Sequence, residues 1–111
     1  MAMDIQVESR EDRCIIHIKG KVTFEYCPAL QSRLDSVINE SVRVVVIDFK
    51  EVPFIDSSGV GEVLRLLKRM QENSGEVVLA NPNSKLQELF AMYRFDKFMK
   101  ILEDTDINAN E

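Results

Sequence analysis

A run of β-branched residues in the middle of the chain limits the possible folds most strongly. Residues Val44 to Ile47 follow one another without a polar break, inside the largely apolar segment 42–49. A strand that is apolar on both sides is buried on both sides, which is typical of an interior strand of a sheet. The sequence therefore predicts a central strand here, with helices covering each face of the sheet.

The spacing of apolar residues on either side of this run predicts alternating strands and helices. The expected elements are strands at 4–8 and 14–19, a helix at 26–39, the central strand, a helix at 60–73, a strand at 77–79, a helix starting at Asn81 and Pro82, and a strand at 98–102. Such alternation is typical of an α/β fold, in which crossover helices pack on the sheet.

The charge balance argues against nucleic acid as a partner. The 111 residues carry a net charge of −5, whereas phosphate backbones favour clustered Lys and Arg. Arg65, Lys68 and Arg69 form a small basic cluster on a predicted helix, broken by Glu62 and Glu72. We expect a solvated helix face with intrahelical charge pairs, and a docking surface for an acidic partner is the alternative.

Length and apolar content indicate one small domain outside the membrane. No apolar stretch approaches the roughly 20 residues that a spanning helix needs. The first residues, Met1 to Asp4, have neither the basic start nor the apolar core of a secretion signal. We therefore expect a cytoplasmic protein.

The sequence contains little that could form a metal or catalytic site. Cys14, Cys27 and His17 are too few and too widely spaced for zinc, and Cys14 is expected to pack as a small hydrophobic residue. No base is recognisable for a serine nucleophile, and no phosphate-binding glycine loop is present. We expect neither cofactor nor metal, and no enzyme.

The segment Asp56-Ser57-Ser58-Gly59 is the most informative candidate site. It lies where an apolar strand passes into a helix, and Asp56 is suited to cap that helix. Gly59 and Gly61 each weaken a helix by roughly 1 kcal/mol relative to Ala. Either the turn packs tightly on a neighbouring strand, or a partner approaches the backbone there.

The preceding segment leaves its role open. Val52, Pro53 and Phe54 could contact a partner, mediate a dimer or belong to the core, and core packing is the expectation for Phe54. We expect a monomer or a weak dimer.

Segments 44–49 and 52–61 together resemble the signature of the STAS domain, and more narrowly that of bacterial anti-sigma factor antagonists. The likeness extends over most of the chain and includes Gly20, Pro28, Leu30, Gly75, Asn81 and Pro82. It implies a single α/β STAS-type domain over residues 1–103, with a mixed β-sheet, an N-terminal strand pair and about three helices packed on it. Residues 104–111 are then an acidic, frayed tail, too short for the further helix with which antagonists usually end.

The resemblance implies a phosphorylation-switched antagonist. Ser57 matches the serine that an anti-sigma factor with serine kinase activity phosphorylates, and Ser58 matches a structural serine. The unphosphorylated antagonist binds the anti-sigma factor and so releases a sigma factor, and a PP2C-type phosphatase reverses the modification. The implied switch surface comprises Asp56, Ser57, Ser58, Gly59, Gly61 and Thr23.

One departure from the family pattern concerns the loop before the first helix. Thr23 occupies a position at which many antagonists carry an aspartate. The alternative function is therefore a STAS scaffold or regulatory subunit that binds another signalling, transporter or lipid-transport partner.

Overall fold

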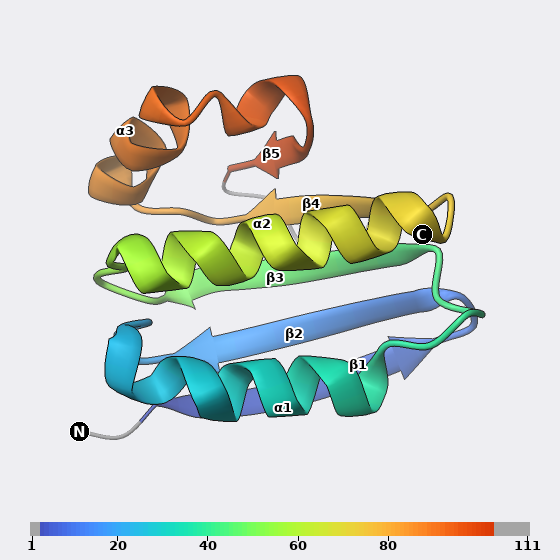
Figure 1. Ribbon diagram of the computed structural model, residues 1–111. Helices are drawn as coiled ribbons and strands as arrows, with labels where there is room; N and C mark the ends of the chain where they lie inside the picture. Colours follow the sequence, from blue (N-terminus) through green and yellow to red (C-terminus); the bar gives the residue numbers. More distant parts are fainter. Residues whose placement is uncertain (1–2, 104–111) are drawn as a thin grey trace.

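A five-stranded sheet organises residues 3–103, the part of the chain that this computed structural model describes (Figure 1). The strands lie in chain order: β1 (Asp4–Arg10), β2 (Arg13–Lys19), β3 (Val44–Glu51), β4 (Glu76–Ala80) and β5 (Lys100–Leu102). β1 and β2 form an antiparallel hairpin, and the pairs from β2 to β5 are parallel. The predicted α/β class, mixed sheet and N-terminal strand pair are confirmed.

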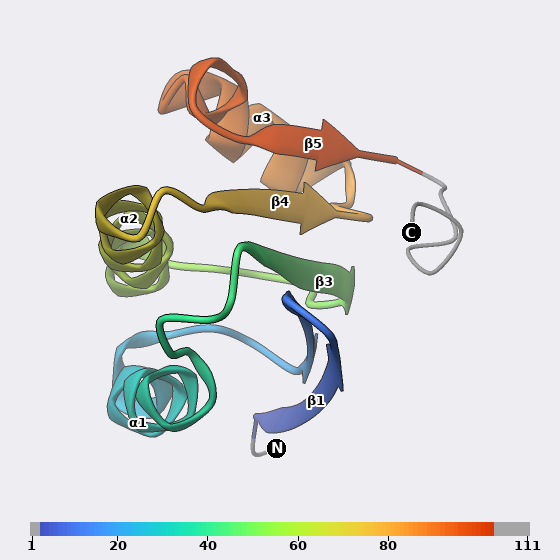
Figure 2. The same cartoon turned by 90° about the vertical axis from the view of Figure 1, so that its right-hand side faces the viewer.

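The helices connect the parallel strands. They are α1 (Cys27–Val37), α2 (Ser57–Glu72) and α3 (Ser84–Met92), with short 3₁₀ helices η1 (Phe24–Tyr26) and η2 (Phe95–Lys97). Figure 2 shows α1 and α2 side by side on one face of the sheet. Pro28 lies in the first turn of α1, as its missing N–H requires.

The central strand is buried as predicted, but not between two layers of helices. Val45 and Ile47 join the main core with the buried residues of α1, α2 and α3. Val46 is 0% exposed and belongs to a separate cluster on the other face, which contains only strand residues in the described part of the chain. The prediction of helices on each face is therefore wrong for residues 3–103.

The third helix begins later than its sequence indicated. Asn83, not Asn81, caps α3, because its side-chain oxygen accepts a hydrogen bond from the Leu86 N–H at 2.8 Å. Asn81 has a φ of 58°, and its N–H donates to the Leu102 carbonyl instead. The last strand is also shorter than predicted, because the 3₁₀ turn η2 holds Phe98 and Met99.

Two further expectations concern the end of the chain and the membrane. The predicted tail at 104–111 and the predicted absence of a terminal helix concern residues outside the described part of the chain. Among residues 3–103, none of the helices is both long enough and apolar enough to cross a membrane.

Candidate functional site

The start of α2 is built around the carboxylate of Asp56. This residue is extended and precedes the first helical residue, Ser57. Its Oδ1 accepts a hydrogen bond from the Gly59 N–H at 3.0 Å, which is the predicted helix cap. Its Oδ2 accepts a second bond, from the backbone N–H of Phe24 at 2.9 Å. This second bond was not predicted, because Phe24 begins η1, in a segment far from Asp56 in the chain.

Residues 22–24 and 54–56 run side by side as a short parallel bridge. The Val22 N–H donates to the Phe54 carbonyl at 3.0 Å, and the Asp56 N–H donates to the Val22 carbonyl at 3.2 Å. Thr23 is thereby held next to the start of α2, half-buried and with no side-chain capping bond to η1. The structure thus places Thr23 next to the Asp56–Gly59 turn.

The two glycines of α2 have opposite surroundings. Gly59 is buried, and a Cβ there would lie 2.6 Å from the Val22 carbonyl oxygen and even closer to Ile55 Cγ1. Tight packing on a neighbouring segment therefore explains Gly59. Gly61 is exposed, and a Cβ there would meet no atom within 4 Å. Close packing within the domain does not explain Gly61.

The side chains around the turn differ in exposure. Ser57 is exposed and Ser58 half-buried. Phe54 is 49% exposed, so the expectation that it packs in the core is wrong. Val52 and Ile55 are the buried residues of this segment, because they face the core on either side of the exposed pair Pro53-Phe54.

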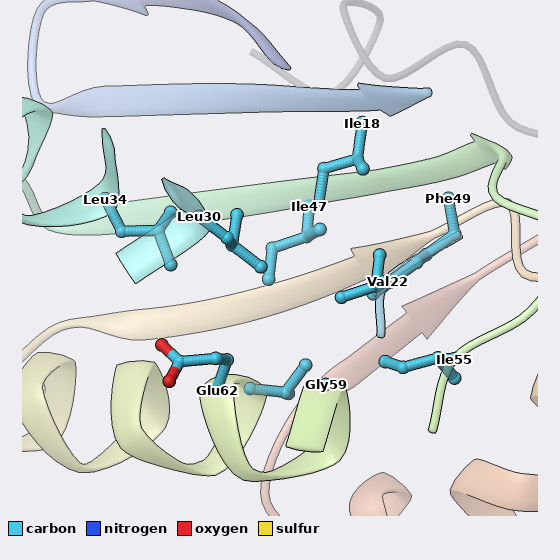
Figure 3. A pocket seen from close by; sticks show the side chains of 10 residues that line it. Ile18, Val22, Leu30, Leu34, Ile47, Phe49, Ile55, Gly59 and Glu62 are labelled. Atoms are coloured by element: carbon cyan, nitrogen blue, oxygen red, sulfur yellow. The ribbon is translucent and has the colours of Figure 1, made fainter. Parts of the chain in front are cut away.

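A small apolar cleft lies beneath the site, between α1, α2 and the sheet (Figure 3). Val22, Ile55 and Gly59 line it, and Glu62 is the charged residue among its walls. Its volume is about 10 Å³, the space of about one water molecule. Small-molecule pockets are far larger, so this cleft is a packing gap rather than a ligand site.

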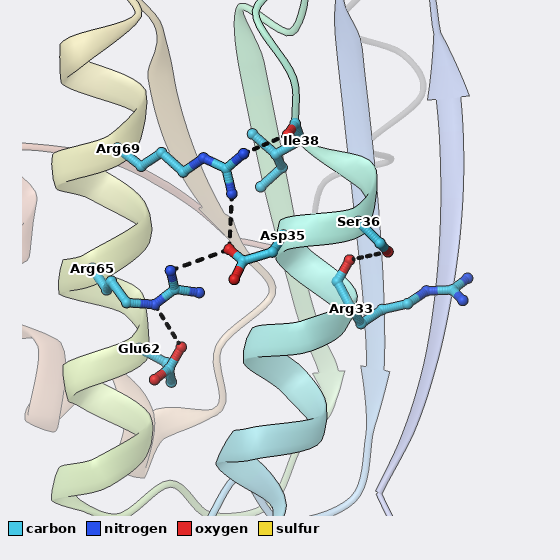
Figure 4. Close-up of polar contacts among 7 residues, drawn as sticks. All are labelled: Arg33, Asp35, Ser36, Ile38, Glu62, Arg65 and Arg69. Carbon is cyan, nitrogen blue, oxygen red and sulfur yellow. Dashed lines mark hydrogen bonds and ion pairs between the residues drawn. The ribbon is translucent and has the colours of Figure 1, made fainter.

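An ion-pair cluster ties α1 to α2 (Figure 4). Asp35 Oδ1 accepts hydrogen bonds from Arg65 Nη1 at 3.2 Å and from Arg69 Nη1 at 2.8 Å. Arg69 Nη2 also donates to the Ile38 carbonyl. Burial alone would lower the pKa of Arg65, but its hydrogen bonds to Glu62 and Asp35 raise it. The expected intrahelical pair is Arg65 with Glu62, and the bridge to α1 was not predicted.

The histidine and the two cysteines do not form a catalytic or metal site with one another in the described part of the chain. His17 is half-buried, with Nδ1 2.7 Å from Asp48 Oδ2 and Nε2 3.2 Å from Glu8 Oε1. Cys14 and Cys27 are buried free thiols, and burial raises the pKa of both. Within residues 3–103 no group of three or more His, Cys, Asp or Glu side chains could hold a metal ion.

Known proteins resemble this chain over nearly its whole length. The family model of the STAS domain matches residues 4–106. The anti-sigma F factor antagonist of Paenibacillus polymyxa is 26% identical over 110 residues, covering 98% of this chain and 93% of the relative.

Two solved structures share the fold. SpoIIAA in its unphosphorylated form has a TM-score of 0.76 at 21% identity, covering 96% of this chain and 94% of the other. The phosphorylated form of the Bacillus protein has a TM-score of 0.77 at 22% identity, covering 96% of each chain. At such identities these likenesses show the fold alone, whereas the family match extends over almost all described residues. This chain belongs to the STAS domain family.

Proposed function

We propose that this protein is a phosphorylation-switched anti-sigma factor antagonist. In its unphosphorylated form it binds an anti-sigma factor that is also a serine kinase, and so releases a sigma factor. The kinase modifies Ser57, and a PP2C-type phosphatase removes the phosphate. This function belongs in the cytoplasm and requires no cofactor, metal or catalytic residue of this chain. The anti-sigma F factor antagonist of Paenibacillus polymyxa is among its relatives, which supports the proposal.

The exposed hydroxyl of Ser57 at the first residue of α2 is the observation that supports this proposal best. A kinase can reach the hydroxyl without unfolding the helix. The positive end of the helix dipole lies at the same point and favours an anion. Half-buried Ser58 is a poorer acceptor, and its proposed role is structural.

The switch follows from the charge of the phosphate. Phosphorylation adds about −1.5 to −2 charges beside Asp56, whose two oxygens already accept backbone hydrogen bonds. The helix dipole lets the fold tolerate this charge. A partner surface that covers Ser57 would instead bury an unpaired phosphate, which weakens binding strongly.

Three variants test the assignment of Ser57. With ATP and the cognate kinase, we expect phosphorylation of the wild type and of Ser58→Ala, but none of Ser57→Ala. We expect Ser57→Asp to bind the anti-sigma factor at least tenfold more weakly than the wild type, by about 1.4 kcal/mol or more. Mass mapping of the phosphate and titration calorimetry give the two measurements. Binding of Ser57→Asp at wild-type strength would refute the switch.

The same experiment separates the scaffold function. A STAS scaffold would not bind the kinase-type anti-sigma factor, and substitutions at Ser57 would not change this. Recovery of transporter or other signalling components, with no kinase-type anti-sigma factor bound by the purified wild type, would support that alternative.

A further inference from the structure

Two large exposed aromatic residues belong to the segments that meet at the proposed switch serine. Phe24 is 76% exposed and Phe54 is 49% exposed. Phe54 lies three residues before Ser57 in the chain, and the backbone of Phe24 is bonded to Asp56, the residue directly before Ser57. Each exposed ring therefore offers apolar surface next to the proposed phosphorylation site, and removing such surface from water favours binding.

Hydrogen bonds hold the backbone that carries both rings. Three hydrogen bonds join the two segments: Val22 to Phe54 at 3.0 Å, Asp56 to Val22 at 3.2 Å and Phe24 to Asp56 at 2.9 Å. Val22 and Ile55, which pair in this bridge, are buried beneath it. A partner would thus meet an ordered surface, and preorganisation reduces the entropy lost on binding.

The exposed ridge of α2 continues this surface. Ser57, Gly61 and Leu64 recur at helical spacing, and all three are exposed. Gly61 has no atom of the domain near its missing side chain, so a partner can approach the backbone there. Leu64 is 42% exposed and adds an apolar contact beyond it.

A second apolar patch lies elsewhere. Met92, Tyr93 and Phe98 are exposed around the end of α3, and Phe98 is 59% exposed. α3 begins near the Asp56–Gly59 turn, where Asn83 Nδ2 donates to the Pro53 carbonyl at 3.3 Å, and the helix leads away from α2 (Figure 1). Phe98 follows η2, in the turn that leads to β5, and so offers a comparison outside the Asp56–Gly59 turn.

From this arrangement we propose that Phe24 and Phe54 are the apolar anchors through which the domain docks on its kinase-type anti-sigma factor. This inference rests on the proposed function. It identifies the contact that makes binding to the anti-sigma factor sensitive to a phosphate on Ser57. Anchors of this type enter desolvated pockets, and aromatic residues are common among them. Water leaves such a contact on binding, so a phosphate on Ser57 would lose its hydration without gaining a partner.

The test compares three exposed phenylalanines in the full chain. We expect Phe24→Ser and Phe54→Ser each to weaken binding to the anti-sigma factor tenfold or more, and Phe98→Ser to change it less than twofold. Urea unfolding checks that each variant folds, and Phe54→Leu, which keeps an apolar side chain, should bind within about threefold of the wild type.

The possible failures are distinguishable. A wild type that binds no kinase-type anti-sigma factor refutes the proposed function. A wild type that binds, together with Phe24→Ser and Phe54→Ser variants that bind equally well, refutes only the anchors. An equal loss in Phe98→Ser refutes them too, because the effect would then not be specific to the switch surface.

Discussion

At the scale of single residues, Gly59 and Gly61 lie two positions apart in one helix and should respond oppositely to the same change. Gly59→Ala forces a methyl group against the Val22 carbonyl, and we expect the free energy of unfolding to fall by about 1–3 kcal/mol. Gly61→Ala meets open space and removes the helix penalty of glycine, so we expect a gain of about 0.5–1 kcal/mol. Urea denaturation followed by circular dichroism measures both.

A loss of stability in Gly61→Ala would contradict the open surroundings of that residue. The sequence alone could not separate the two glycines, because the atoms that crowd Gly59 belong partly to Val22, in a distant segment. The local motif predicted the cap at Asp56 correctly, whereas the apolar spacing placed the start of the helix at residue 60 and α2 begins at Ser57. The motif could not predict the bond from Phe24 or the exposure of Phe54, which depend on how two loops meet.

At the scale of elements, the ion-pair cluster around Asp35 links α1 to α2 and contributes to the free energy of unfolding. Asp35→Ala removes the acceptor of both arginines, and we expect a loss of about 0.5–1.5 kcal/mol in the free energy of unfolding. The estimate is modest because the Asp35 side chain is 48% exposed. Urea unfolding at low salt and at 1 M NaCl gives the measurement.

Salt distinguishes the ion pairs from simple packing. Screening should shrink the difference between Asp35→Ala and the wild type at 1 M NaCl. Ser36→Ala is the matched control, because Ser36 is exposed on the same helix and bonds only the nearby Arg33 carbonyl in the hydrogen bonds described. A difference that is unchanged by salt would contradict the electrostatic role of Asp35.

The element pattern was predictable where the apolar spacing is long and regular. α2 and β3 show this, since their stripes are set by burial against one core. The predicted boundary of an element was wrong where a contact from a distant segment decided which of two residues caps the helix. Asn81 and Asn83 are both suitable caps, and the bond from Asn81 to Leu102 selects Asn83 for α3. Likewise, the apolar residues on both sides of β3 correctly predicted that both faces are buried. They could not predict which elements cover each face.

At the scale of the whole molecule, the proposed switch requires that charge at position 57 alter binding and leave the fold intact. Ser57 is the first residue of α2, so Ser57→Asp places a negative charge at the positive end of the dipole. Repulsion from Asp56 opposes this gain. We expect the free energy of unfolding to stay within about 0.5 kcal/mol of the wild type, while binding to the anti-sigma factor falls.

The opposite end of α2 provides the control. Gln71 is exposed in the last turn of the helix, where the dipole is negative. Gln71→Asp should therefore lower the free energy of unfolding by about 0.3–1 kcal/mol, and leave the switch surface unchanged. Urea unfolding and titration calorimetry on both variants give four values. If Ser57→Asp destabilised the domain more than Gln71→Asp, the helix dipole would not offset the added charge, and a switch that leaves the fold undisturbed would be contradicted.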